Sequence, residues 1–159
     1  MVNAEREMSH EFNMAVYELD QLGANWTLDS ESYEEQLRAR EADLIDKIVD
    51  PVERNELQRI IADLLFRHFT ARSSNIPKIR EINTLCDNFG FFHIYDKIIH
   101  RLEFALALDA NGACGEAAAL LDELLTELGE MDSNEFMIVD SIRCVMAHKA
   151  DVLRRLRAR

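Results

Sequence analysis

The sequence predicts an all-α protein, a helical bundle of six to seven helices that forms a single domain over residues 1–159. Three observations predict this fold class. Apolar residues recur at the spacing of three and four that amphipathic helices require, and alternation with a period of two never lasts more than a few residues. The chain contains only 5 Gly and 2 Pro, and therefore few obligatory turns. A chain of 159 residues is also long enough to bury one core.

The first two helices are separated by a short break. The first is predicted over residues 4–22 and ends at residues 23–26, where a buried Trp26 is expected to close the end of the bundle. The second is predicted to begin at Ser32, whose side chain forms a capping box with Glu35. Its apolar positions are sparse, so we expect it to lie on the surface and to pack along one narrow edge.

The third helix has the clearest start signal. Asp50 can cap it, Pro51 fits its first turn and Glu53 closes a capping box, while the pattern ends near Ala71. The residues expected on its buried side follow the helical spacing closely: Leu57, Ile60, Ile61, Leu64, Leu65 and His68.

Two further helices follow before the most acidic part of the chain. A short fourth helix is predicted after Pro77 and stops at Gly90. The fifth is the most apolar, and it continues to the break at residues 111–112.

The last two helices are predicted on either side of Gly129. The leucines of the sixth helix share one side: Leu120, Leu121, Leu124, Leu125 and Leu128. The seventh is expected to begin with a capping box of Asp132 and Glu135. Its predicted inward residues are Phe136, Val139, Ile142, Met146, Ala150 and Leu153.

The stretch from Asp109 to Asp140 contains nine carboxylates and neither Lys nor Arg. Because the leucines occupy one side of the sixth helix, the acids fall mostly on the other side and form a face of one charge sign. Such a face repels nucleic acid and attracts basic protein surfaces. The residues predicted to contact a protein partner here are Asp122, Glu123, Glu127 and Glu130.

The charge balance limits the classes of partner. The formal net charge is −12, and the one short basic cluster is the C-terminal group Arg154, Arg155, Arg157 and Arg159. Duplex DNA is bound through many cationic side chains, so we predict no direct contact with nucleic acid. The basic cluster is interpreted as the end of a helix whose cations suit the helix dipole.

Cysteine usage and hydropathy predict the compartment. Cys86, Cys114 and Cys144 form no Cys-x-x-Cys pair, and an odd number argues against a disulfide framework. The N-terminus lacks the apolar segment of a signal peptide, and no apolar run reaches the length of a membrane span. We therefore expect a soluble, cytoplasmic protein without membrane contact.

Two constellations could carry chemistry. Asp96, His100 and Glu103 share one side of the fifth helix, a pattern that could bind a metal or tune a histidine. We favour an ordinary surface ion pair between Asp96 and His100. Cys144 and His148 are spaced as half of a zinc site, but a half-buried Cys beside a surface His is the favoured interpretation. No catalytic residue, cofactor or metal is predicted.

Residues 92–103 read Phe-His-Ile-Tyr-Asp-Lys-Ile-Ile-His-Arg-Leu-Glu. This run resembles a stretch in the regulator-of-sigma-D family of bacterial anti-sigma factors, where a Phe, an Ile-Tyr, an acid, a base, two aliphatics, a His, a base and Leu-Glu recur in similar order. Members of that family are helical bundles of similar size that sequester the housekeeping sigma factor. The resemblance implies that the chain binds the basic DNA-reading domain of a sigma factor. Tyr95, Asp96 and His100 are the further predicted partner-binding residues.

His100-Arg101-Leu102 is also similar to the start of the motif of histidine phosphotransfer domains, which are four-helix bundles. In this chain Glu103 and Phe104 stand where that family has a Lys that neutralises the phosphoryl group and a Gly that lets the partner approach. Both departures argue against a working phosphotransfer site. The favoured interpretation of His100 is a partly exposed helix residue.

These observations predict a non-enzymatic regulator that sequesters or adapts a protein partner with a basic surface, with a sigma-like transcription factor as the first partner class. A secretion component bound by an acidic adaptor or chaperone is the alternative. A phosphorelay or metal-dependent activity centred on His100, as in a degenerate phosphotransfer bundle, and a DNA-mimic inhibitor are further hypotheses. A homodimer is left open.

Overall fold

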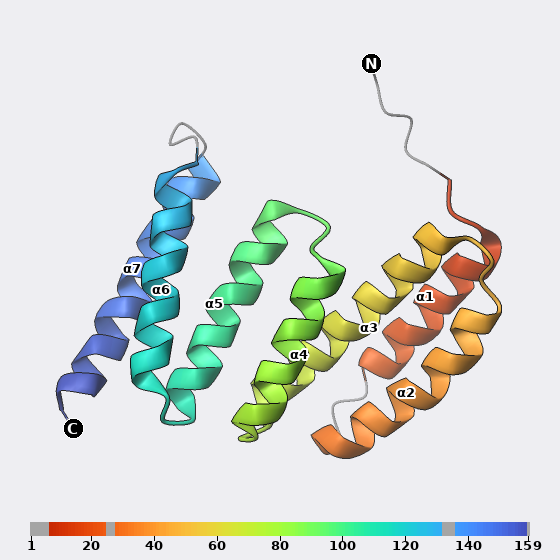
Figure 1. Cartoon of the computed structure of the whole chain (residues 1–159), viewed down its shortest axis with the longest axis horizontal. Helices are drawn as coiled ribbons and strands as arrows, with labels where there is room; N and C mark the ends of the chain where they lie inside the picture. Colours follow the sequence, from red (N-terminus) through yellow and green to blue (C-terminus); the bar gives the residue numbers. More distant parts are fainter. Residues whose placement is uncertain (1–6, 25–27, 132–135, 159) are drawn as a thin grey trace. The chain divides into compact units, whose positions relative to one another are not determined.

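The structure, a computed structural model, describes residues 7–24, 28–131 and 136–158, and all regular secondary structure within these ranges is α-helical (Figure 1). The all-α fold class is therefore confirmed. The helices of the described part are α1 (His10–Gly23), α2 (Ser30–Asp46), α3 (Pro51–Arg72), α4 (Ile76–Phe89), α5 (Ile94–Ala110), α6 (Cys114–Gly129) and α7 (Phe136–Arg157). The predicted start of the first helix at Ala4 was too early, because residues 7–9 are not helical and Ser9 caps α1. Trp26 and the Asp132–Glu135 capping box lie outside the described residues.

Side-chain caps fix the helix starts. At α3 the backbone N–H of Val52 donates to Asp50 Oδ1 at 2.9 Å, so the predicted cap is confirmed. At α2 the prediction was wrong by three residues, because Asp29 and not Ser32 is the cap. The backbone N–H of Ser32 donates to Asp29 Oδ1 at 2.8 Å. Asp and Ser side chains can both accept a backbone hydrogen bond at a helix start, and here Asp29 is the residue that caps α2.

Glycines end two of the helices. Gly90 follows α4 with φ +79°, and Gly112 follows α5 with φ +91°. Both values lie in the left-handed region, which glycine adopts without a steric penalty. The predicted breaks at these positions are confirmed.

The helices group into two compact units. Unit 1 comprises the described residues of Met1–Ser73 and Arg80–Gly90, and unit 2 comprises those of Ser74–Ile79 and Phe91–Arg159. Helix α4 contributes its first residues to unit 2 and the remainder to unit 1. The single domain over residues 1–159 stays a prediction.

In unit 1, α1 and α2 both pack against α3. The largest buried side chains of unit 1 include Leu19, Leu37, Leu57, Ile61, Leu65 and Phe66. His68 of α3 is also buried, as predicted, and its ring stacks on Tyr33 of α2 with centroids 4.1 Å apart. Burial lowers the pKa of His68, which favours the neutral ring in this core.

In unit 2, α6 packs against both α5 and α7 (Figure 1). The core between them contains Leu108, Leu121, Leu124, Leu128, Val145 and Val152. One ion pair also fastens α7 to α5: Arg155 pairs with Asp109, whose exposed fraction is only 8%. Arg155 at the basic end of α7 therefore stabilises the fold. Arg154 and Arg157 also lie in the last turn, where cations interact favourably with the helix dipole.

The predicted inward side of α7 was wrong. The buried residues are Ile138, Val145 and Val152, all 3% exposed or less. Of the predicted residues, Met146 is 57% exposed. Ala150 is also exposed, Val139, Ile142 and Leu153 are half-buried, and the side chain of Phe136 lies outside the described part. Helix α7 carries two adjacent apolar stripes, and only one of them is fully buried against α5 and α6.

Candidate protein-docking surface on α6

Helix α6 separates its leucines from its acids, as predicted. Leu121, Leu124 and Leu128 are at most 1% exposed. Leu120 and Leu125 are half-buried at the borders of this seam. The predicted contact residues Asp122, Glu123 and Glu130 are exposed and Glu127 is half-exposed. The helix spacing thus produces an acidic outer face over an apolar seam.

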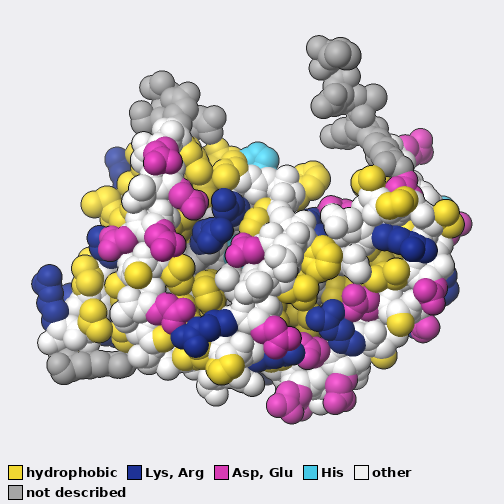
Figure 2. Space-filling model, viewed as in Figure 1, with side chains coloured by type: hydrophobic (Ala, Val, Ile, Leu, Met, Phe, Trp, Pro, Cys, Tyr) yellow, Lys and Arg dark blue, Asp and Glu magenta, His cyan; other side chains and the backbone are white. Residues whose placement is uncertain are grey.

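Two lysines of the neighbouring helices reach this face. Lys149 of α7 forms an ion pair with Asp122, and Lys97 of α5 lies 3.9 Å from Glu127, measured from Nζ to Oε2. The acidic stretch contains no base, so its charge appeared unopposed in the sequence. Figure 2 shows basic side chains next to acidic ones over α6 and its neighbours in unit 2. The face is therefore less negative than predicted.

Two acids of this face have no basic partner among the described residues. Glu123 and Glu130 are exposed, and neither forms an ion pair with any residue that the structure describes. The Asp122 and Glu127 side chains are 58% and 41% exposed. Ion pairs at such exposed positions stabilise a fold by about 0–1 kcal/mol, so the lysines can be displaced at little cost. The surface therefore consists of two unopposed carboxylates, Glu123 and Glu130, and two weakly paired ones, Asp122 and Glu127.

The start of α5 lies beside the end of this face, because Lys97 pairs with Glu127. Asp96 does not pair with His100, so the predicted surface ion pair was wrong. Its Oδ2 accepts the backbone N–H of His93 at 3.0 Å, which completes a capping box at the start of α5. Tyr95 is half-buried, and its ring stacks on His93 with centroids 4.7 Å apart.

His100 is inside the protein, so the predicted partly exposed position was wrong. It is 4% exposed, and its ring centroid lies 4.9 Å from that of Phe91. Burial, with a smaller contribution from the Arg101 charge, lowers the pKa of His100 to about 4. The ring is therefore neutral at pH 7 and does not form part of the outer surface. The helical spacing could not reveal this, because Phe91 precedes α5 and its contact with His100 is tertiary.

The remaining chemical candidates do not assemble into a site in the described residues. No group of three or more metal-binding side chains occurs there. Cys86 and Cys114 are buried, and the Cys86 thiol donates to the Ala62 carbonyl at 3.4 Å. Burial raises the pKa of Cys86 to about 12. Cys144 is exposed, not half-buried as predicted.

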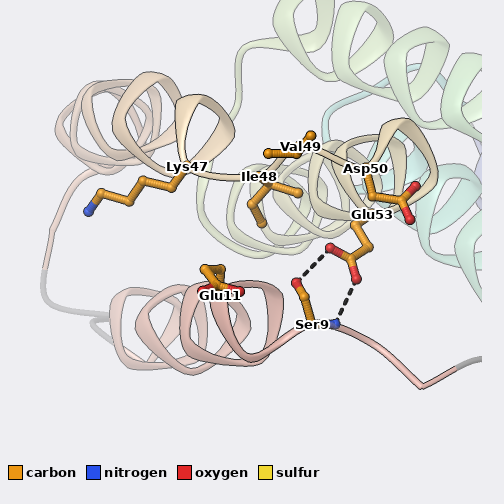
Figure 3. A pocket seen from close by; sticks show the side chains of 7 residues that line it. All are labelled: Ser9, Glu11, Lys47, Ile48, Val49, Asp50 and Glu53. Carbon is orange, nitrogen blue, oxygen red and sulfur yellow. Dashed lines mark hydrogen bonds between the residues drawn. The ribbon is translucent and has the colours of Figure 1, made fainter.

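Unit 1 contains a pocket of about 400 Å³. Its lining residues are Ser9, Glu11, Lys47, Ile48, Val49, Asp50 and Glu53 (Figure 3). Glu53 is 4% exposed, and its two oxygens accept the backbone N–H and the hydroxyl of Ser9, both at 2.7 Å. The Ser9 hydroxyl in turn caps α1. The buried carboxylate therefore ties the start of α1 to the start of α3. The sequence pattern indicates only a local role for Glu53 in a capping box, because its partner Ser9 is 44 positions away.

No family model, curated protein or solved structure matches this chain. None of the described helices is both long and apolar enough to cross a membrane.

Proposed function

We propose that this chain is a non-enzymatic regulator that binds a protein partner with a basic surface through the outer face of α6. One observation carries the proposal: Glu123 on α6 and Glu130 at its C-cap are exposed, the helix is anchored by buried Leu121, Leu124 and Leu128, and no described residue neutralises the two acids. A helix anchored by a packed seam holds its charges in place before the partner arrives. Pre-organised charges of one sign speed encounter and select partners of the opposite sign.

The two lysines give the surface a second property. While no partner is bound, Lys97 forms an ion pair with Glu127 and Lys149 forms one with Asp122. A partner's Lys or Arg can replace them, since exposed ion pairs contribute little to the fold. The bridged carboxylates then add to the contact. Apolar residues at its edge set most of the lifetime of the complex.

The partner class rests on sequence. The resemblance of residues 92–103 to the regulator-of-sigma-D family supports a sigma-like transcription factor as the proposed partner, in the cytoplasm. A secretion component is the alternative. A role of His100 in phosphotransfer is disfavoured, because a side chain that is 4% exposed offers no access to a phosphoryl donor.

Affinity capture at low salt, followed by mass spectrometry, identifies partners. The affinity of the captured partner is then measured over a salt series and against the double variant Glu123→Lys/Glu130→Lys. A matched control, Asp20→Lys/Glu35→Lys, changes the net charge equally at two exposed positions of unit 1. We expect the α6 variant to weaken binding at least tenfold, about 1.4 kcal/mol, while the control changes it little.

Two results would contradict the proposal. Binding that does not weaken between low and high salt would exclude a contact led by charge. Equal weakening by the α6 variant and the control would show that net charge acts without this face.

A further inference from the structure

Helix α7 carries an apolar stripe that its own unit covers only in part. We call it the outer stripe; its residues are Val139, Ile142, Met146, Ala150 and Leu153. They are spaced three and four apart, so they share one side of the helix. Met146 at the middle is 57% exposed, whereas the adjacent seam of Ile138, Val145 and Val152 is fully packed.

A helix at the edge of a bundle needs one apolar stripe, and α7 has two. Scattered exposed apolar residues are ordinary on protein surfaces, but a continuous stripe marks a surface that another molecule covers. The outer stripe extends from Val139 to Leu153, which are 14 positions apart, or about 21 Å at 1.5 Å per residue. That length matches about four turns of a second helix.

Both long borders of the stripe carry a base of α7, and the acids of α6 lie along only one of these borders. Lys149 lies beside the stripe, three residues after Met146, and its ion pair with Asp122 brings the acidic face of α6 to this border. Arg143 lies on the other border, three residues before Met146. It is exposed, and no ion pair joins it to a described residue. Arg154 is also exposed on that border, where it forms an ion pair with Asp151 of the same helix.

We propose that the outer stripe of α7 docks one amphipathic helix of the protein partner. That helix has an apolar stripe with Lys or Arg along the border that meets the acids of α6 and Asp or Glu along the border that meets Arg143. The inference rests on the proposed function and specifies the shape and charge of the segment that is bound. Docking of an amphipathic helix through anchors at this spacing is a common recognition mode.

A second copy of the chain fits the stripe less well. Antiparallel pairing of two α7 helices about a two-fold axis sets each border against itself, acid against acid and arginine against arginine. Parallel pairing aligns the two helix dipoles. The net charge of −12 also opposes association of identical chains.

The test uses the full chain and a synthetic helical peptide of about four turns. The probe has a Leu/Ile stripe, Lys on one border and Glu on the other; a control peptide has Glu on both borders. Fluorescence anisotropy measures the affinity of each. We expect the chain to bind the probe at least tenfold more tightly than the control peptide, about 1.4 kcal/mol.

Helix α7 supplies a matched pair of variants. Met146→Glu places a charge in the stripe, and Met137→Glu places it about two and a half turns away, on the opposite side of the same helix. The two methionines are 57% and 53% exposed, so both variants should fold, which circular dichroism checks. We expect Met146→Glu to weaken probe binding at least tenfold, because it buries a charge in an apolar contact, and Met137→Glu to leave binding unchanged.

Three outcomes overturn the inference: no binding of the probe to the unaltered chain, equal effects of the two Met variants, or self-association of the chain that Met146→Glu abolishes. The captured partner separates this inference from the proposed function. If Met146→Glu leaves partner binding intact while Glu123→Lys/Glu130→Lys weakens it, the docked helix is wrong and the acidic contact stands. If Met146→Glu weakens partner binding while Glu123→Lys/Glu130→Lys leaves it intact, the acidic contact is wrong and the docked helix stands.

Discussion

The carboxylate at the start of α3 in unit 1 and the carboxylates on α6 in unit 2 have the same chemistry and different surroundings. Glu53 is 4% exposed and accepts two hydrogen bonds from Ser9. The Asp122 side chain is 58% exposed and has one lysine as its partner. Burial, more than charge, therefore decides whether an acid stabilises the fold or is free to contact a partner.

The physical reason is the dielectric environment. A buried acceptor that loses its donors has no water to replace them, whereas an exposed carboxylate is solvated whether or not a lysine is near. Acids in the two regions should therefore respond differently to substitution. Stability should depend on Glu53, and partner affinity should depend on the α6 face.

The largest expected effect is that of Glu53→Ala. It leaves the Ser9 N–H without its acceptor and releases the start of α1, so we expect a loss of about 3 kcal/mol in the free energy of unfolding. Urea denaturation measures it. Glu11→Ala is the control, because Glu11 lines the same pocket but is exposed, and its loss should stay below about 1 kcal/mol. Equal losses would show that burial does not distinguish Glu53 from an exposed acid in its contribution to stability.

The next effect extends the comparison to a buried base in unit 2. The pKa of His100 is lowered to about 4 in the folded state, against about 6.5 in an unfolded chain. The unfolded chain therefore binds the extra proton first, and stability that is complete above pH 6.5 falls as the pH drops towards 4. The difference amounts to about 3 kcal/mol.

Urea denaturation at several pH values checks this prediction. The variant His100→Gln should lose this part of the pH dependence, whatever its absolute stability. His148→Gln, at a half-buried position of α7, should keep it. Identical pH profiles for the unaltered chain and His100→Gln would show that His100 is accessible to protons in the folded state.

The smallest effect on stability is expected for Lys149→Ala. Its ion pair with Asp122 is exposed, so we expect a loss below about 1 kcal/mol in the free energy of unfolding. Affinity for a basic partner should rise, because Asp122 is then unopposed. Titration calorimetry with the captured partner measures this rise. A stability loss as large as that of Glu53→Ala would place Asp122 among the structural acids and weaken the proposed function.

The parts of the fold that the sequence predicted well depend on local interactions. The start of α3 at Pro51 and the glycine breaks after α4 and α5 involve residues within a turn of one another. The buried leucines of α6 were also predictable, because one stripe dominates that helix. Such features need no knowledge of the neighbouring helices.

The features that were missed are tertiary. The periodicity of α7 offers two stripes, and only the position of α6 decides that Val145 is buried and Met146 exposed. The lysines that oppose the acidic face come from helices on either side of it, and Phe91 encloses His100 from outside α5. The predicted docking residues Asp122, Glu123, Glu127 and Glu130 do share a face, but the pairing of Asp122 and Glu127 with lysines could not be read from their own segment.

Because two of the three cysteines are buried, Cys144 is the one thiol that reagents can reach. Cys86 and Cys114 are buried, and the raised pKa of Cys86 keeps its thiolate scarce, while Cys144 is exposed on α7. Two residues along a helix point to nearly opposite sides, so Cys144 faces away from Met146. A maleimide dye should therefore attach at a single place without engineered thiols, and report the arrival of a docked helix without obstructing it.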